Sequence, residues 1–533
     1  MTTPASADVR LETDGRGSRL IVDGRPFLVR GGEVSNSHGE PGSLAPHWER
    51  FAELGMNTVI TPVSWDVIEP VEGTFDWTTV DGVIEAARAH SLRVVLLWFG
   101  SWKNSMSCYA PAWVKADTAR FPRCRRSDGS AMEMLSPLSP ESRSADAQAF
   151  AALMRHLRDV DTARTVVLVQ VENEVGMIPE PRDRTPAADA AYAAPVPREL
   201  TRYLSEHRET LAPTLRSRWS EAGERSDGTW IEVFGESIWT EELFTAWSLA
   251  GYVEAVAAAG KAELELPMYT NAALPRPATQ PGQYPSGGPL PHLIDIWRAA
   301  APSLDFLSPD IYFPNFSDWA DRYAQPGNPL FVPEALRDIE AGTNALYAFG
   351  SHAALGFAPF GIESISGPAA AMLAGAYGVV EQLTPLIVEH GGLGTMAGLI
   401  APSQDQRTPH RVDIGDLTLH ATYEHTPAPQ LADGVINESG DHRGEVRLPA
   451  GAIVVQTGVD ELVLAGIGVT VTFTARGGGT EQIGILACEE GGYADAHWRH
   501  GRWLNGDQTH QGRHVRLPPG GFSIQRVRLY RYS

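Results

Sequence analysis

The first 390 residues of this 533-residue chain alternate between short apolar segments and amphipathic stretches. Each apolar segment has the length of a strand and ends in polar residues, and the stretches between them show helical periodicity. The apolar segments span 28–34, 57–62, 93–99, 166–171, 267–273, 305–313, 329–334 and 356–363. Eight such strand–helix units predict an α/β fold of the (β/α)8 barrel type, with a leading strand pair at 18–29.

The pattern changes after Gly391 and Gly392. The rest of the chain has short, partly β-branched runs at 417–423, 453–456, 469–473 and 484–487, separated by Gly, Asp and Pro. Such runs are typical of an antiparallel β-sandwich. A chain of 533 residues also exceeds what one hydrophobic core usually serves. We therefore predict a catalytic barrel over residues 1–390 and a smaller all-β sandwich domain over residues 391–533.

Charge and cysteine content argue against several kinds of partner. The formal net charge of −22 disfavours nucleic acid and anionic membranes, which both select for basic surfaces. Three cysteines are too few and too scattered for a disulfide framework or a zinc site built from CxxC pairs. The N-terminus lacks the apolar core of a signal peptide, and no later run has the length of a bilayer span. The expectation is a cytoplasmic enzyme without a nucleic-acid or membrane partner.

The fourth apolar segment ends unusually for a buried strand. VVLVQVENEVG (166–176) runs as an apolar strand to Val171 and then presents Glu172, Asn173 and Glu174. Because side chains alternate along a strand, we expect Glu172 and Glu174 on one face. In (β/α)8 barrels, chemistry gathers at the carboxyl ends of the strands. This strand end therefore predicts a catalytic carboxylate.

A second carboxylate should come from another strand end. Glu334 closes the seventh segment (PLFVPE), and Glu363, which closes the eighth (GFAPFGIE), is the competing candidate. Two carboxylates from opposite sides of a barrel mouth suit retaining glycoside hydrolysis, in which one protonates the leaving oxygen and the other attacks the anomeric carbon.

QVENEVG (170–176) closely resembles a segment of glycoside hydrolase family 35, a β-galactosidase family in a large clan of barrel glycosidases. LIVDGRPF (20–27), SWDVIEPVEGTFDW (64–77) and YAPAWV (109–114) resemble further segments of that family, and the C-terminal part is similar to the β-domain of a bacterial subgroup. The resemblance implies that Glu174 is the acid/base and Glu334 the nucleophile. It also implies that Asn173 bonds the 2-hydroxyl of the sugar.

Two positions depart from the family's pattern in the expected sugar pocket. Pro62 stands where the family has a substrate-facing tyrosine, and Ser101 stands where it has an acidic residue. Other groups must then bind the axial 4-hydroxyl. The candidates, at the ends of the first and third strands, are Glu33, Asn36, Lys103 and Asn104.

Four more residues are candidate sugar contacts, each with an alternative reading. Tyr312, at the end of the sixth strand, either touches the nucleophile or packs at the rim of the core, and Asn271 on the fifth strand is similar. Trp102 is either a platform for the apolar face of a sugar or a core residue. Glu363, like Glu33, either contacts substrate or supports the site by hydrogen bonds behind it.

The stretch at 497–514 is rich in histidine, with His497, His500, His510 and His514. A metal site would need acidic or Cys partners at ligand spacing, which the stretch lacks, so we expect solvated loop histidines there.

These patterns predict a retaining, exo-acting β-galactosidase that hydrolyses terminal non-reducing β-D-galactosyl residues, with no metal and no cofactor. Its partner is a glycoside or oligosaccharide, and homo-oligomerisation is left open. A second hypothesis keeps the mechanism and changes the sugar to a β-glucoside, β-glucosaminide or α-L-arabinopyranoside, or transfers the glycosyl group to a sugar acceptor. A third, a non-catalytic sugar-binding barrel, would require one of the two carboxylates to be missing, and both are present.

Overall fold

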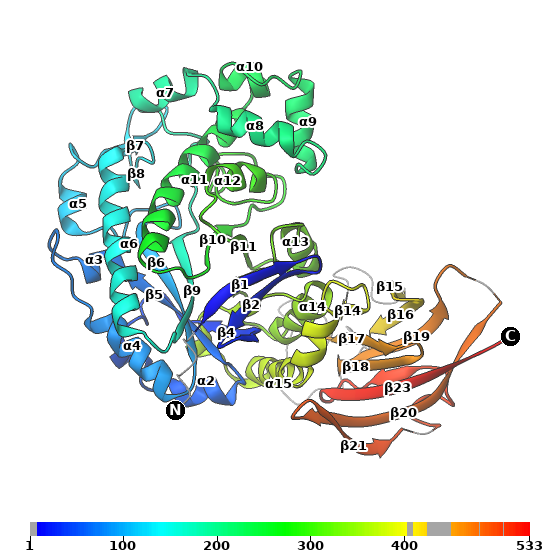
Figure 1. Cartoon of the computed structure of the whole chain (residues 1–533). Helices are drawn as coiled ribbons and strands as arrows, with labels where there is room; N and C mark the ends of the chain where they lie inside the picture. Colours follow the sequence, from blue (N-terminus) through cyan, green and yellow to red (C-terminus); the bar gives the residue numbers. More distant parts are fainter. Residues whose placement is uncertain (1–7, 402–408, 424–448, 479, 505) are drawn as a thin grey trace, which may run out of the picture.

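The computed structural model of the protein describes residues 8–401, 409–423, 449–478, 480–504 and 506–533 (Figure 1). The chain forms a closed barrel of eight parallel strands, followed by antiparallel sheets. In order around the barrel, the strands are β4 (Val29–Glu33), β5 (Thr58–Ser64), β6 (Arg93–Lys103), β9 (Val166–Asn173), β10 (Met268–Ala273), β11 (Phe306–Ile311), β12 (Phe331–Ala335) and β13 (Gly356–Pro359). Each overlaps one predicted segment, and the predicted fold class is confirmed.

The barrel strands are buried on both faces, which explains why the sequence shows continuous apolar runs instead of alternation. Every residue of β9 is buried, and in β5 only Ser64 is partly exposed. Strands of this kind form a sheet whose outer face is covered by helices.

Helices cover the outside of the barrel. The longer ones are α4 (Thr78–Ala89), α6 (Pro140–Val160), α11 (Ile238–Glu263), α12 (Ile294–Ala300), α13 (Phe316–Tyr323), α14 (Ala341–His352) and α15 (Gly367–His390). The short ones are α1 (Pro41–Leu44), α2 (Trp48–Glu53), α3 (Trp65–Ile68), α5 (Ala112–Ala116) and the 3-10 turn η1 (Ile362–Ser364). α6 shows how such a helix begins: Pro140 sits in its first turn, and the Ser139 side chain accepts a hydrogen bond from the Ser142 N–H.

The connection between β9 and β10 carries a helical lobe at the top of Figure 1. Its helices are α7 (Pro186–Ala193), α8 (Arg198–Glu206), α9 (Pro213–Glu221) and α10 (Trp230–Phe234). α7 lies in a segment whose proline content is typical of a loop. It forms because Pro186 is tolerated in the first helical turn and the Thr185 side chain accepts a hydrogen bond from the Ala188 N–H.

Small sheets flank the barrel. β1 (Val9–Asp14), β2 (Gly17–Val22) and β3 (Arg25–Pro26) form an N-terminal antiparallel sheet, one strand more than predicted, and β7 (Arg123–Arg125) pairs with β8 (Ala131–Leu135).

The C-terminal part contains two antiparallel sheets, to the right of the barrel in Figure 1. The six-stranded sheet consists of β14 (Met396–Ile400), β17 (Gly451–Gly458), β18 (Glu461–Ile467), β23 (Ser523–Tyr532), β20 (Gln482–Ala494) and β21 (His497–Trp503). The four-stranded sheet consists of β15 (His410–Ile414), β16 (Leu417–Tyr423), β19 (Val469–Ala475) and β22 (Val515–Leu517). Part of the histidine-rich stretch is therefore strand β21 and not a loop. Within β21, the ring of His500 packs against that of Trp503.

The two faces of the six-stranded sheet belong to different cores. Ile453 and Val455 of β17 join the core of the barrel, whereas Ala452 and Val454 join the core shared with the four-stranded sheet. Alternate residues point to opposite faces of a strand, so one strand serves both cores. The barrel's contribution to this contact comes from α14, which packs on β14 and β17.

Two helices, Ile238–Glu263 and Gly367–His390, are long and apolar enough to cross a membrane by length and composition. This corrects the expectation that no run has that length. Their apolar character has a role within the fold, because α11 packs on α6, and α15 packs on α14.

Candidate active site

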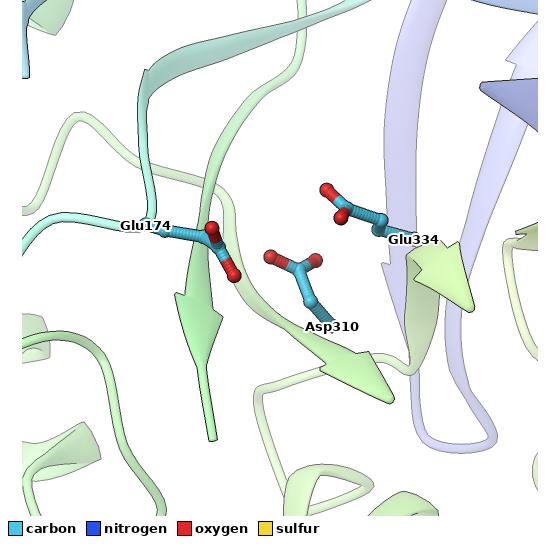
Figure 2. Close-up of side chains that lie close together, drawn as sticks. All are labelled: Glu174, Asp310 and Glu334. Atoms are coloured by element: carbon cyan, nitrogen blue, oxygen red, sulfur yellow. The ribbon is translucent and has the colours of Figure 1, made fainter. Parts of the chain in front are cut away.

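Polar residues gather where the barrel strands end. Glu174 directly follows β9, Asp310 lies on β11 and Glu334 lies on β12, paired in register with Asp310. Their side chains point toward one another in Figure 2. One carboxylate oxygen from each lies within 4.8 Å of the other two, and all three residues are buried. The structure thus brings together the two carboxylates that the sequence singled out.

Glu174 is held by neighbours on two other strands. Its backbone N–H donates to Asn271 Oδ1 on β10 at 2.8 Å, and its φ of +44° is one that L-residues rarely adopt. Asn104 Nδ2 donates to its carboxylate, and Lys103 Nζ lies 3.8 Å from Oε2. Glu174 is therefore held through its backbone from β10 and through its carboxylate from the end of β6. Burial raises the pKa of Glu174, while Lys103 and a hydrogen bond from Asp310 act to lower it.

Glu334 is held by Tyr312, whose hydroxyl donates to Oε1. Its Oε2 is buried and has no hydrogen-bond partner among the described residues. Burial, and next the charge of Glu174, raise the pKa of Glu334 to about 7, against the opposing effects of Lys103 and Tyr312. Tyr312 itself is 37% exposed and touches Glu334, which is the first of its two readings.

Two further acids and one base surround this pair. Burial raises the pKa of Glu33 and of Asp310 well above their usual ranges, and the neighbouring carboxylates add to the effect. Lys103 is 5% exposed; burial lowers its pKa, but four carboxyl groups outweigh burial and the net shift is upward. Its ammonium therefore supplies a fixed positive charge among acids that cannot all ionise together.

Asn173 is fully buried, and both its side-chain Oδ1 and Nδ2 lack a partner among the described residues. The same holds for Oε1 of Glu33 and Oδ1 of Asn36, in the loop after β4. Buried polar atoms are normally hydrogen-bonded, so these atoms are available to a polar ligand. They are three of the predicted sugar contacts. Asn104, another predicted contact, is exposed and donates to Glu174.

Asn271 has a different role from the one predicted. Its Oδ1 accepts from Glu174 N–H, and its Nδ2 donates to Asp310 Oδ2 at 2.7 Å. Both ends of the amide are engaged within the protein, so Asn271 positions two acids.

Glu363 is also not at the site's centre. Its carboxylate accepts from the backbone N–H of Ser35 at 3.2 Å and from the Ser35 hydroxyl, and it lies 3.8 Å from His38 Nδ1. Of the two readings, support of the loop after β4 is the one that this geometry favours. Glu363 is engaged elsewhere and does not compete with Glu334.

Of the two readings of Trp102, sugar platform or core residue, the structure supports the core residue. Its side chain is fully buried, its indole N–H donates to the Leu135 carbonyl at 3.2 Å, and its ring centroid lies 4.4 Å from that of Tyr252. Ser101, expected in the sugar pocket, is likewise buried and bonded to the Tyr252 hydroxyl at 2.6 Å. Both lie in the core beneath the site.

Glu172 does not share a face with Glu174. Its carboxylate accepts from the N–H groups of Ser101 and Trp102 at 3.1 and 2.7 Å. Positive φ angles of +61° at Glu172 and +44° at Glu174 interrupt the alternation on which the prediction depended. Burial, followed by the nearby Asp146, raises the pKa of Glu172 well above its usual range.

Asp310 is the member of this carboxylate cluster that sequence analysis missed. The signal was available, because Asp310 is two positions before Tyr312 in the predicted sixth strand and so shares its face. Glu174, Asp310 and Glu334 also form the group of three acids or histidines in the described residues that is close enough to hold a cation. Lys103 already supplies positive charge there.

Comparisons with known proteins agree with this chemistry. Residues 38–222 match a family model described as "Beta-galactosidase" (glycoside hydrolase family 42), and residues 373–516 match one described as "Domain of unknown function (DUF5597)". The first match includes Glu174 and ends before Glu334. A segment of 84 residues is 29% identical to a beta-galactosidase of Xanthomonas manihotis; it covers 15% of this chain and only 14% of that protein.

Solved structures show distant similarity. The beta-galactosidase of the psychrophilic Marinomonas ef1 is 14% identical with a TM-score of 0.46, over 67% of this chain and 60% of that one. The beta-galactosidase of the haloarchaeon Halorubrum lacusprofundi is 15% identical with a TM-score of 0.44, over 67% of this chain and 58% of that one. The catalytic domain of a Paenibacillus polymyxa beta-amylase is 14% identical with a TM-score of 0.43, over 64% of this chain and 95% of that one.

The family match and the curated relative indicate a barrel of the glycoside hydrolase type, similar to beta-galactosidases. The finer assignment to family 35 is not confirmed, because the matched model is that of family 42.

Proposed function

We propose that the protein is a retaining, exo-acting β-galactosidase, with Glu334 as nucleophile and Glu174 as acid/base. The observation that carries the proposal is the meeting of these two buried carboxylates, whose nearest oxygens lie within 4.8 Å. Retention requires carboxyl groups about 5–5.5 Å apart, whereas inversion leaves room for a water with a gap of about 6.5–9.5 Å. The close approach supports retention.

In the first step, Glu334 attacks the anomeric carbon while Glu174 gives its proton to the leaving oxygen. The raised pKa of Glu174 suits the acid, because burial disfavours its carboxylate. Tyr312 steadies the attacking carboxylate through its hydroxyl. In the second step, Glu174 takes a proton from a water molecule. That water attacks the anomeric carbon, and Glu334 leaves as a carboxylate.

The proposed sugar-binding groups are the buried polar atoms without a partner among the described residues, together with the two donors beside Glu174. We assign Asn173 to the 2-hydroxyl, and Glu33, Asn36, Lys103 and Asn104 to the remaining hydroxyls. Leaving one such buried group unpaired costs about 1–3 kcal/mol, so a sugar that satisfies several of them gains specificity. The galactose preference and the family 35 assignment rest on sequence similarity, and both belong to this proposal.

A panel of nitrophenyl glycosides tests the substrate. We expect the highest kcat/KM for the β-galactoside, with one sugar released at a time from the non-reducing end of an oligosaccharide. Product analysis by NMR tests the mechanism, with β-galactose formed first. A much higher kcat/KM for the β-glucoside, β-glucosaminide or α-L-arabinopyranoside refutes the substrate, and an initial α-product refutes retention.

A further inference from the structure

A hollow of about 480 Å³ lies between the helical lobe and α13, apart from the carboxylate cluster. Its walls come from three consecutive connections of the barrel. α9 and the start of α11 lie between β9 and β10, residues 275–292 lie between β10 and β11, and α13 lies between β11 and β12. Pro275, in one wall, follows the end of β10 by two residues, so the hollow begins on the catalytic side of the barrel.

The lining of the hollow opposes the charge of the chain. Asp and Glu outnumber Lys and Arg by 65 to 43 in the sequence, yet the lining contains Arg218, Arg276, Arg322 and His292 and no carboxylate. In the part of the chain that the structure describes, none of the three guanidinium groups has a carboxylate at ion-pair distance or a hydrogen-bond acceptor. Arg276 and Arg322 are exposed, and Arg218 is half-buried. These groups are therefore free to bind an anion.

Aromatic rings hold two of these arginines in place. The guanidinium carbon of Arg218 lies 5.0 Å from the ring centroid of Trp239, and that of Arg322 lies 4.7 Å from that of Trp319. Both tryptophans also line the hollow. Arginine offers a planar fork of donors that matches a carboxylate or a sulfate, and a stacked arginine loses less freedom on binding. Tryptophan provides the broad apolar contact that the face of a sugar ring needs.

The wall formed by 275–292 is fixed from below. Glu242, a buried residue of α11, accepts from His292 Nε2 at 2.9 Å and from Gly287 N–H at 3.3 Å. This carboxylate is engaged beneath the wall; its charge and that of Glu221 raise the pKa of Arg218, but burial outweighs them. The net lowering of this pKa reflects a cost of desolvation that a bound anion would offset.

We propose that this hollow binds a sugar residue carrying a carboxylate or a sulfate group, in the glycan that the enzyme acts on. The proposal rests on the proposed function for the identity of the ligand as a saccharide. The arginines supply the charge, and the tryptophans supply the apolar contact that a free inorganic anion would not use.

Calorimetric titration of the full chain tests the proposal without turnover. The probes are α-1,4-linked trigalacturonic acid and a sulfated galactose disaccharide, with a neutral galactose oligosaccharide and inorganic sulfate as references. We expect one or both acidic saccharides to bind at least tenfold more tightly than either reference, and more weakly as salt increases. Which acidic saccharide binds better identifies the anionic group.

Variants locate the binding. Arg218→Gln combined with Arg322→Gln should weaken binding of the acidic saccharide at least tenfold, and Arg276→Gln, at an exposed position after β10, should weaken it several-fold. Arg202→Gln is the matched control, since Arg202 is an exposed arginine of the same lobe outside the hollow.

Three results overturn the inference: no binding of either acidic saccharide, equal binding of a reference, or no effect of the hollow variants. Hydrolysis of nitrophenyl β-galactoside without such binding refutes this inference alone. Binding without hydrolysis refutes the proposed function alone.

Discussion

Asp310 lies between the two proposed catalytic carboxylates. Asp310→Asn and Asp310→Ala together distinguish the effect of its hydrogen bonding from the effect of its charge. Asn271 Nδ2 donates to Asp310 Oδ2, and an Asp310 oxygen lies within 4.8 Å of a Glu174 oxygen, from where a protonated Asp310 lowers the pKa of Glu174. The raised pKa of Asp310 means that it keeps its proton when less buried acids have lost theirs. An asparagine at 310 can accept from Asn271 and donate to Glu174 as the protonated acid does, whereas an alanine can do neither.

The magnitudes follow from the contacts that are lost. Asp310→Ala leaves the buried amide of Asn271 without its acceptor, which should lower the free energy of unfolding by about 1–3 kcal/mol. It also removes the donor that a protonated Asp310 offers to the charged carboxylate of Glu174, and such a hydrogen bond is worth about 1.5–3 kcal/mol. If that bond stabilises Glu174 as its proton departs, kcat should fall by about 10- to 150-fold. Asp310→Asn should stay within about 1 kcal/mol of the parent in stability and within about tenfold in kcat near neutral pH.

Urea unfolding and steady-state kinetics on nitrophenyl β-galactoside measure the two effects. If Asp310→Asn loses as much activity as Asp310→Ala, a negative charge at Asp310 is required and the protonated form is not the working one. If neither variant differs from the parent, Asp310 does not act through Glu174.

Further predictions concern Glu334, Glu174 and their pH dependence. Glu334→Gln should lower kcat by several orders of magnitude with the fold retained by circular dichroism, and Glu363→Gln, the matched control, should lower it far less; the reverse order would exchange the roles. Glu174→Ala should spare the first step on substrates with good leaving groups and stall the second, so that added azide yields a β-glycosyl azide; equal loss on activated and unactivated substrates contradicts an acid/base role. Because Glu334 must be ionised to attack and its pKa is about 7, kcat/KM should fall as pH falls through about 7. Tyr312→Phe removes a hydrogen bond that lowers this pKa, so the midpoint of that fall should move to higher pH. A midpoint that stays or moves to lower pH refutes the assignment. A raised folded-state pKa of Glu334 adds to the free energy of unfolding below pH 4.5, and this contribution is lost as pH rises through about 7. The free energy of unfolding should therefore fall less between these pH values in Glu334→Gln than in the parent. An equal fall would contradict the raised pKa.

The barrel could be predicted from the sequence because its strands are buried on both faces. A strand such as β9, with every residue buried, leaves a mostly apolar run that is too short for a typical helix. The C-terminal sheets were less visible. The edge strand β21 is largely exposed, and the histidines and arginines of HWRHGRW do not mark it as a strand. Pairing with β20, which a local pattern does not encode, makes it one.

The positions of Glu174 and Glu334 could be predicted because each ends a strand of the barrel, and parallel strands bring their carboxyl ends to one edge. The orientation of each side chain could not. The alternation rule placed Glu172 beside Glu174, but positive φ at both residues turns their side chains to different neighbours. Trp102 was misplaced for a similar reason. In the pairing of β6 with β9, Trp98 lies opposite Val171 and Lys103 lies opposite Asn173, so β6 has more residues than β9 between these two pairs. The extra residues form a bulge whose side chains fall below the site.

That bulge explains why a buried strand ends in two glutamates. Glu172 accepts the N–H groups of Ser101 and Trp102 and so fixes the turn of β6 that precedes Lys103 and Asn104. Those two residues then reach Glu174. Asp146 of α6 holds the same turn by accepting from Ser101 N–H at 3.0 Å. Glu172 therefore fixes the backbone that brings the Lys103 ammonium and the Asn104 amide to Glu174. Of the two glutamates in ENE, the first positions the site and the second is proposed to carry out its chemistry.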